Sequence, residues 1–210
     1  AQPRPGPARA GMIVRDNVYG TPSEDAVRRD FSVNALAFDP KSFSVIDYVG
    51  GLEDLQHGII RTIGPPDASF AEDPVRMLRA IRFKVRLGFS LHPAVEAALR
   101  SMAGQLTLAT RHRLAEEMQR FLTAGQAEAV FAEFRRFGLL EPMLGLAEHR
   151  RYFRGDALED PFPLLLPFLR ALDSWVARGG EPISPTVALL GALVALARPE
   201  LARDLKGERE

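Results

Sequence analysis

The chain has 210 residues, carries 27 Lys and Arg against 27 Asp and Glu, and contains no cysteine. Apolar residues near half and charged residues about a quarter are typical of a folded protein of one or two small domains. The lack of cysteine excludes disulfides and cysteine metal ligands, and the neutral balance disfavours a protein that coats nucleic acid without specificity.

Residues 1–10 are rich in proline, basic and without hydrophobic periodicity, so we expect a disordered loop of a longer parent protein. This segment has no apolar core of the length that a signal sequence needs. The apolar run at 187–197 is too short to cross a bilayer, which takes about 20 residues, and we expect it to be a buried helix. We therefore expect a cytoplasmic protein with no membrane partner.

A first concentration of charge lies at Arg28, Arg29 and Asp30. The residues that follow, 31–37, alternate between apolar and polar as a strand does, although a short helix could also carry them. Taken alone, such a charge group would be a surface pair beside a buried strand.

Residues 43–64 combine β-branched and aromatic runs with paired glycines, which predicts short strands joined by turns and a helical turn near 52–55. Gly50 and Gly51 are not a dinucleotide-binding fingerprint, because the third glycine and the long following helix are missing. We expect this pair to let the chain bend sharply.

A helix is predicted over residues 74–87. Asp73 supplies an N-cap acceptor, Pro74 suits the first helical position, and Gly88 is the residue type that often ends a helix in a left-handed conformation. Helical spacing divides this segment into two stripes. The apolar stripe contains Leu78, Ile81 and Val85, and the basic stripe contains Arg76, Arg79, Arg82 and Arg86.

The basic stripe belongs to a longer basic region. Residues 74–113 contain eight Lys and Arg but a single acid, Glu96, whereas a solvated helix usually alternates the two signs. A solvated surface is the ordinary explanation of a charge run, but this imbalance indicates a polyanionic ligand.

Asp73 and Arg76 lie three residues apart and so project to the same side of the predicted helix. A carboxylate accepts from an exocyclic amino group while a guanidinium donates to a ring nitrogen, so the pair can imitate a Watson–Crick edge. The alternative is an N-cap with an ordinary helical ion pair, and the spacing alone leaves both open.

The chain after residue 91 is predicted to be largely helical. Apolar residues recur at helical spacing over 92–102, 114–123 and 127–137, and further apolar helices are expected over 161–175 and 185–197. The predicted fold class is therefore mostly α with a small α+β part. Four histidines show no metal-ligand spacing and are expected at the surface or in caps: His57, His92, His112 and His149.

Segments 28–35 and 72–83 resemble two nucleotide-contacting motifs of the class II nucleotidyltransferases, which comprise bacterial poly(A) polymerases and CCA-adding tRNA nucleotidyltransferases. The resemblance covers residues 11–144, and residues 15–26 and 125–140 look like the poly(A) polymerases. It implies template-independent addition of AMP from ATP to RNA 3′ ends, as in mRNA polyadenylation and RNA decay.

The resemblance also assigns roles to particular residues. It implies a nucleotide-binding set of Arg28, Arg29, Asp30, Asn34, Asp73, Arg76, Arg79 and Arg82. Asp73 and Arg76 would read the base. Arg79 and Arg82 would contact the triphosphate, and the first motif would lie near the sugar and phosphates. The RNA 3′ end would be held by Lys84, Arg86, Arg111 and Arg113.

In the family's terms, residues 11–64 would be the C-terminal part of the head domain, residues 65–125 a neck that binds nucleotide and RNA, and residues 126–210 part of a helical body. The family's glycine-rich loop and its Asp-x-Asp pair, whose carboxylates hold Mg²⁺, lie well upstream of the first motif and are missing from the 27 residues before Arg28. We therefore expect a fragment of a longer enzyme, without metal ligands or catalytic residues of its own and without turnover alone.

Two other functions stay open. CCA addition to tRNA is the close alternative within the same family. The alternative from another class is a non-catalytic helical module that binds RNA and has kept the nucleotide-reading surface. Charge-preserving changes at Asp73 and Arg76 distinguish an enzyme from such a module. They should alter nucleotide choice in an enzyme and matter little to a module bound through phosphates.

Overall fold

The computed structural model describes residues 20–145, 160–181 and 183–206, and of Pro185 and residues 198–206 it describes only the backbone. The predicted loop at 1–10 lies outside these ranges, as do His149 and residues 15–19 of the segment that looks like the poly(A) polymerases.

Helices make up most of the described chain. They are α1 (Pro22–Val27), α2 (Gly51–His57), α3 (Pro66–Glu72), α4 (Val75–Leu87), α5 (Pro93–Met102), α6 (Arg111–Leu122), α7 (Ala127–Arg136), α8 (Leu140–Leu144), α10 (Phe162–Ala177) and α11 (Pro185–Lys206). Two 3-10 segments, η1 (Ser32–Asn34) and η2 (Ala103–Leu108), accompany the strands β1 (Ala37–Asp39), β2 (Ser44–Ile46), β3 (Ile59–Ile60) and β4 (Ser90–Leu91). This composition confirms the predicted fold class.

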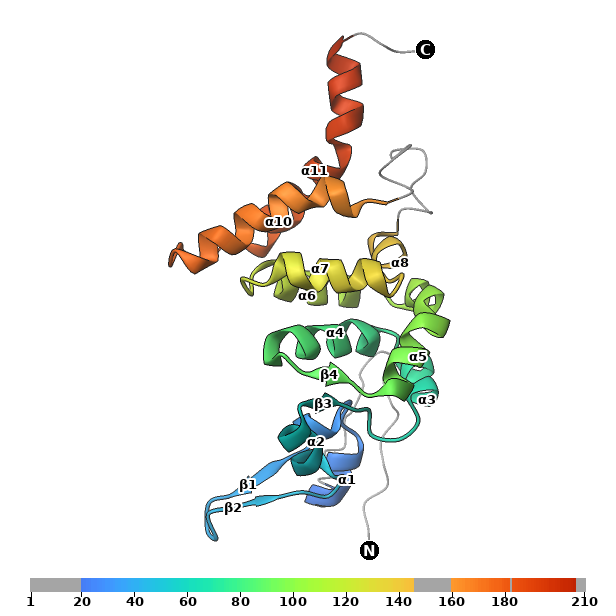
Figure 1. Ribbon diagram of the computed structural model, residues 1–210, viewed down its shortest axis with the longest axis vertical. Helices are drawn as coiled ribbons and strands as arrows, with labels where there is room; N and C mark the ends of the chain where they lie inside the picture. Colours follow the sequence, from blue (N-terminus) through green and yellow to red (C-terminus); the bar gives the residue numbers. More distant parts are fainter. Residues whose placement is uncertain (1–19, 146–159, 182, 207–210) are drawn as a thin grey trace, which may run out of the picture.

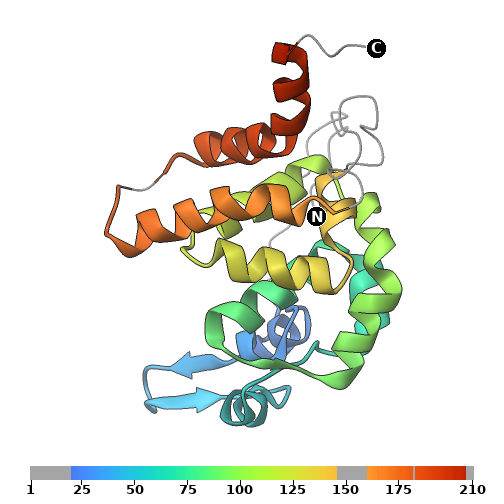
Figure 2. The same cartoon turned by 45° about the horizontal axis from the view of Figure 1, so that its top comes forward.

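The helices are stacked in layers, with the small α+β part at one end (Figures 1 and 2). In Figure 1 the stack rises from the β1–β2 hairpin and α2, through α4 and then the α6–α7 layer, to α10 and α11. The short helices α3 and α5 lie along one side of this stack. The core is continuous through the layers and includes Phe31, Phe70, Phe121, Phe131 and Phe134.

The predicted helix at 74–87 is confirmed as α4, which begins one residue later than expected with Pro74 at its N-cap. Gly88 ends it in the left-handed conformation at φ +68°. Leu78 and Ile81 are fully buried, and α4 packs against both α6 and α7. The apolar stripe therefore faces the core, which leaves the basic stripe at the edge of the layer.

The first charged motif is carried by a turn rather than a strand. Phe31 is fully buried and pairs with Thr62 in an isolated antiparallel bridge. The 3-10 segment η1 follows immediately, so of the two predicted possibilities the short helix is the one that forms. Strand β1 begins only at Ala37 and pairs antiparallel with β2, while β3 and β4 pair in parallel. The tight turn brings Asp30 and Asn34 close enough for a hydrogen bond of 3.2 Å.

The predicted bend at the paired glycines is confirmed and holds α2 against η1. Gly50 adopts φ +81° at the N-cap of α2, and the Asp47 carboxylate accepts hydrogen bonds from four backbone N–H groups at residues 49–52. These bonds, foremost the one from Leu52, lower the pKa of Asp47. Gly51 approaches Ser32 so closely that a Cβ atom there would lie 2.2 Å from the Ser32 carbonyl oxygen.

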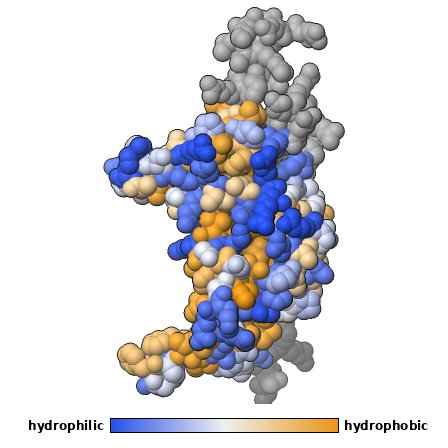
Figure 3. All heavy atoms as spheres, in the orientation of Figure 1, coloured by the Kyte–Doolittle hydropathy of each residue, from blue (hydrophilic) through white to orange (hydrophobic). Residues whose placement is uncertain are grey.

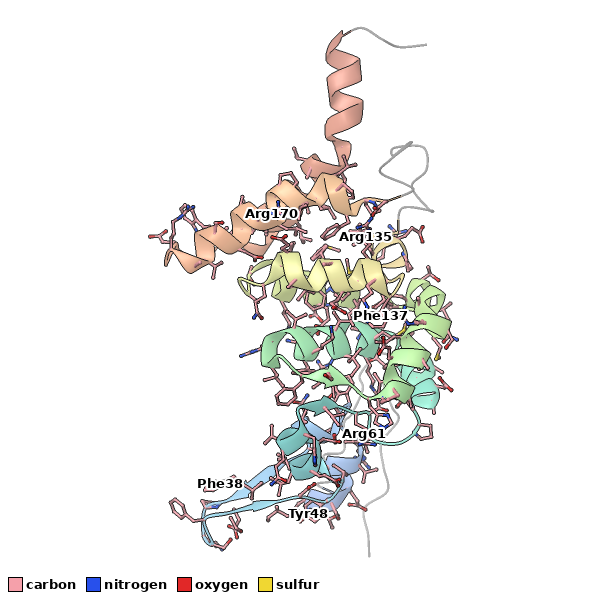
Figure 4. The ribbon with its side chains drawn as sticks, in the orientation of Figure 1. Phe38, Tyr48, Arg61, Arg135, Phe137 and Arg170 are labelled. Atoms are coloured by element: carbon pink, nitrogen blue, oxygen red, sulfur yellow. The ribbon has the colours of Figure 1, made fainter. Side chains whose placement is uncertain are left out.

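Polar contacts tie the upper layers together. Lys84 on α4 pairs with Glu133 on α7 at 2.6 Å. Asp173 on α10 accepts from the backbone N–H groups of Ala127 and Glu128 at 2.7 and 2.9 Å, so one layer caps the first turn of the next. Arg170, labelled in Figure 4, also reaches down from α10 to pair with Glu128.

The expectation of a buried helix at 187–197 was wrong in two respects. Helix α11 continues to Lys206, and it buries only one face, which includes Ala188, Ala192 and Leu196. Its opposite face exposes Val187 and Leu190 by more than half. No described helix is long and apolar enough to cross a membrane.

The β1–β2 hairpin projects from the stack, and orange atoms cover much of it in Figure 3, beside blue and white ones. Phe43 is 83% exposed, and its ring meets that of Phe38 edge-on at a centroid distance of 5.7 Å. Phe38 lies on the hairpin, away from the helical layers (Figure 4). The short strands β1 and β2 therefore leave unpaired edges and apolar rings on the surface.

Replacing Gly51 by alanine should destabilise the fold by about 2 kcal/mol, because the added methyl group meets backbone atoms that cannot move independently. Gly104→Ala is the matched control, since nothing lies within 4 Å of a Cβ atom at that position. Urea unfolding followed by circular dichroism measures both. Equal stability of the two variants would show that the approach to Ser32 is not a constraint.

Candidate functional site

A cavity of about 410 Å³ opens where the first charged motif meets α4 and α6. Its lining residues are Arg28, Arg29, Asp30, Asn34, Asp73, Arg76, Arg79 and Arg113. Seven of these are residues of the nucleotide-binding set, and Arg113 comes from the set expected to hold RNA. We call this the arginine cavity. Its volume lies in the range of cavities that hold small molecules, about 300–1,000 Å³.

Asp30 is the buried acceptor that organises one wall of the arginine cavity. It is 9% exposed, and its Oδ1 accepts from the backbone N–H of Phe31 and from Asn34 Nδ2. Its Oδ2 accepts from Arg79 Nε at 2.6 Å, which joins the first motif to α4 across 49 residues of sequence. Asp30 therefore positions the Arg79 guanidinium.

Arg29 lies at the rim, with a half-exposed side chain. It donates to the Asp25 carboxylate and to the Asn34 carbonyl oxygen, so α1 and η1 hold it between them. Among the described residues, the side chain of Arg28 makes no hydrogen bond or ion pair, and Arg28 lines both the arginine cavity and an adjoining one beside α3.

Asp73 and Arg76 face the same cavity but do not pair with each other. Arg113 on α6 donates to both carboxylate oxygens of Asp73, at 2.8 and 2.6 Å, and this contact raises the pKa of Arg113. Asp73 Oδ1 also accepts from the backbone N–H of Val75, although the N-cap of α4 is Pro74 and not Asp73 as the sequence predicted. Arg76 instead donates to Glu72 and to Ser69 on α3.

Glu117 on α6 is a buried acid that the sequence analysis missed. Its side chain is 3% exposed overall, and it lies between three arginines, with Arg79 Nη1 at 3.7 Å, Arg82 Nε at 3.6 Å and an ion pair to Arg120. A signal was available, because Glu117 stands three residues after Leu114 and four before Phe121, on the apolar stripe of a predicted helix.

The remaining predicted residues lie elsewhere. Arg82 and Arg86 line a separate cavity beyond Glu117, and the Arg82 guanidinium lies over the Phe83 ring at 5.0 Å. Lys84 is paired with Glu133 between α4 and α7. Arg111 lines a mostly apolar cavity formed with α8 and α11.

The arginine cavity can hold an anion and orient a planar polar group. Five arginines and two aspartates line it, so positive charge dominates, while Asp73 offers acceptor oxygens beside the Arg76 donors. Within the described residues, no group of three or more His, Cys, Asp or Glu side chains could hold a metal ion.

Comparison with family models gives two matches. A model described as the poly A polymerase head domain matches residues 8–61, and one described as the probable RNA and SrmB-binding site of polymerase A matches residues 88–149. The first covers Arg28 to Asn34, and the second covers Arg113 and Glu117.

Individual proteins also match part of the chain. Poly(A) polymerase I from Salmonella typhimurium is 42% identical over 133 residues, which are 63% of this chain and 29% of that protein. A multifunctional CCA protein from Xanthomonas campestris pv. campestris is 40% identical over 139 residues, 64% of this chain and 33% of that protein. The chain thus spans about a third of the length of these relatives.

A solved structure also matches over most of the chain. It is that of a tRNA nucleotidyltransferase complexed with a primer tRNA and an incoming ATP analog. The match has a TM-score of 0.64 at 31% sequence identity and covers 84% of this chain and 49% of that one.

Replacing Glu117 by glutamine should lower the free energy of unfolding by about 3 kcal/mol, because three guanidinium groups then face each other without the carboxylate between them. Glu116→Gln removes the same charge from the adjacent position, where the side chain is half-exposed, and should cost less than about 0.5 kcal/mol. Denaturant unfolding of the two variants makes the comparison. A Glu117→Gln variant as stable as Glu116→Gln would contradict the structural role of this acid.

Proposed function

Since the chain carries the head-domain and RNA-binding segments of the class II nucleotidyltransferases, we propose that it forms the nucleotide-selecting part of an enzyme that adds AMP from ATP to RNA 3′ ends without a template. The observation that supports this most is the arginine cavity, where residues from η1, α4 and α6 converge on one space of nucleotide size. The RNA 3′ end and ATP are the proposed partners.

In this proposal Asp73 and Arg76 read the base. Adenine presents an amino group that donates beside a ring nitrogen that accepts, which matches a carboxylate beside a guanidinium. Guanine and uracil present an oxygen acceptor beside a ring N–H donor, which is the reverse arrangement. Opposite Asp73 and Arg76, the hydrogen-bonding groups of either base would therefore lack a matching partner. The pair therefore selects ATP against GTP and UTP.

Base reading would require Asp73 to exchange partners. Its two oxygens are engaged by Arg113 in the described structure, so an incoming amino group must share or replace one of those bonds. Arg113 is half-exposed and can move toward solvent or toward the nucleotide phosphates. The exchange is favourable only for a base that supplies the missing donor.

The triphosphate would lie against Arg79, with Arg28 and Arg29 at the rim. Arg79 is held from two sides by Asp30 and Glu117, so its position is fixed before a ligand arrives. A preorganised cation gives more binding free energy than a mobile one, because less conformational entropy is lost. We assign Mg²⁺ binding and the chemical step to the Asp-x-Asp pair that the family resemblance places upstream of the first charged motif.

CCA addition is a second candidate because of the same base-reading chemistry. Cytosine also carries an amino donor next to a ring nitrogen acceptor, so Asp73 and Arg76 would accept CTP as well as ATP. The CCA protein relative and the tRNA nucleotidyltransferase structure fit this candidate.

Asp73→Asn in the natural gene product should reduce the preference for ATP over GTP about tenfold to a hundredfold, since each correct base pairing is worth about 1–3 kcal/mol. Asp67→Asn is the control, because this exposed acid on the neighbouring helix α3 does not line the arginine cavity. Incorporation of each nucleotide into RNA is followed on sequencing gels. If the Asp73→Asn variant kept the full preference for ATP over GTP, the assignment of base reading to Asp73 would be wrong.

A second assay distinguishes the candidate functions. The natural gene product, with the 210-residue chain beside it, is offered ATP or CTP with magnesium and either generic RNA or a tRNA lacking its 3′ end. We expect long extension of generic RNA with ATP alone and none by the 210-residue chain alone. CTP incorporation limited to the tRNA would identify the CCA-adding relative instead. RNA binding without incorporation of either nucleotide by the gene product would favour the non-catalytic module.

A further inference from the structure

A second basic cavity, of about 470 Å³, lies between the end of α4 and the loop that joins α6 to α7. Three arginines line it, Arg82, Arg86 and Arg120, together with residues of the α6–α7 loop that include Gln126. No acidic residue lines it. We call it the neck cavity, and the arginine cavity shares none of its lining residues.

The positive charge of the neck cavity is only partly neutralised. Glu117 pairs with Arg82 and Arg120 of the neck cavity, and the same carboxylate also pairs with Arg79 of the arginine cavity. Arg82 Nε and Glu117 Oε2 are both buried and have no hydrogen-bond partner among the described residues, since the 3.6 Å between them is too long for a hydrogen bond. Burial, together with the nearby Arg79, Arg120 and Arg86, lowers the pKa of Arg82, whereas Glu117 raises it.

Donor groups are also available at the mouth of the neck cavity. Arg86 and Gln126 are exposed, and neither side chain has a hydrogen bond or ion pair with another described residue. The loop that carries Gln126 requires glycine at position 125, because Gly125 adopts φ +75° and a Cβ atom there would lie 2.8 Å from Val176 on α10. Arg86 and Gln126 are therefore available to donate to a ligand.

We propose that the neck cavity binds a backbone phosphate of the RNA strand whose 3′ end is extended, at a point on the strand behind that end. This inference rests on the proposed function for the identity of the strand. The cavity itself is an anion site on the evidence of its three arginines, of the buried Arg82 Nε that has no hydrogen-bond partner, and of the donors at its mouth.

The lining residues favour a phosphodiester over a nucleotide base. A base-reading site needs acceptors as well as donors, as Asp73 and Arg76 provide in the arginine cavity, but the neck cavity has no carboxylate in its lining. Its single aromatic residue, Phe121, is 1% exposed and packs edge-on with Phe134, so it offers no ring face for a base to stack on. Contacts of this kind position a strand without reading its sequence.

The test measures binding of a fluorescein-labelled oligoadenylate of twelve nucleotides to the 210-residue chain by anisotropy, between about 50 and 200 mM salt. Arg86→Gln should weaken binding several-fold and reduce the slope of log K against log salt by about 0.7, the value for one phosphate contact on a single strand. Gln126→Glu should weaken binding further, because it places a negative charge at the cavity mouth. An acid is tolerated there, at the N-cap of α7, so folding should be preserved.

Arg178→Gln is the matched control, since Arg178 is exposed at the end of α10, outside both cavities. The affinity for ATP, measured by calorimetry on the same samples, should stay within twofold of that of the unaltered chain in all three variants. This second measurement tests the arginine cavity independently of RNA binding. An unchanged salt slope in Arg86→Gln, or an equal change in Arg178→Gln, would overturn the strand-phosphate site. The proposal would also be overturned if the neck-cavity variants lost ATP binding and kept RNA binding. That result would assign the neck cavity to the nucleotide phosphates.

Discussion

The arrangement of the site depends on one buried carboxylate, that of Glu117. It lies where α4 and α6 meet, between three guanidinium groups, those of Arg79, Arg82 and Arg120, and partly offsets their charge. Without it, the basic stripe of α4 would face another arginine across a packed interface, and like charges at that distance repel strongly in a poorly hydrated environment. The same carboxylate separates the two cavities, because Arg79 lines one and Arg82 and Arg120 line the other.

The arginine cavity shows a second constraint, which is that its acids are already paired. Asp30 holds Arg79 and Asp73 holds Arg113, so a ligand enters a network of existing ion pairs rather than a set of free charges. Such pairs keep the guanidinium groups of Arg79 and Arg113 in place and limit the free energy that non-specific anions gain there, since an existing contact must be broken for a new one to form. Selectivity for a base with an amino donor is a natural outcome of this exchange at Asp73.

The surrounding fold explains why these residues meet. The first charged motif turns in η1, which is held against α2 by the close approach of Gly51 to Ser32 and by the four hydrogen bonds that Asp47 accepts. The upper helices fix α6 through α7 and α10, with Asp173 capping α7 from the next layer. The site therefore lies at the junction of the small α+β part and the helical stack (Figure 1).

Local signals in the sequence determined the existence and limits of α4, its two stripes and the common side of Asp73 and Arg76, because helix caps and helical spacing act within a few residues. They also indicated a bend at Gly50 and Gly51, but not that Ser32 lies against it. Only the tertiary structure decided the ion pairs, since Asp30 meets Arg79 across 49 residues and Asp73 meets Arg113 across 40. It likewise divided one basic stripe between two cavities and paired Lys84 with Glu133. Packing between distant helices sets which charges are neutralised, and no local pattern in the chain encodes that choice.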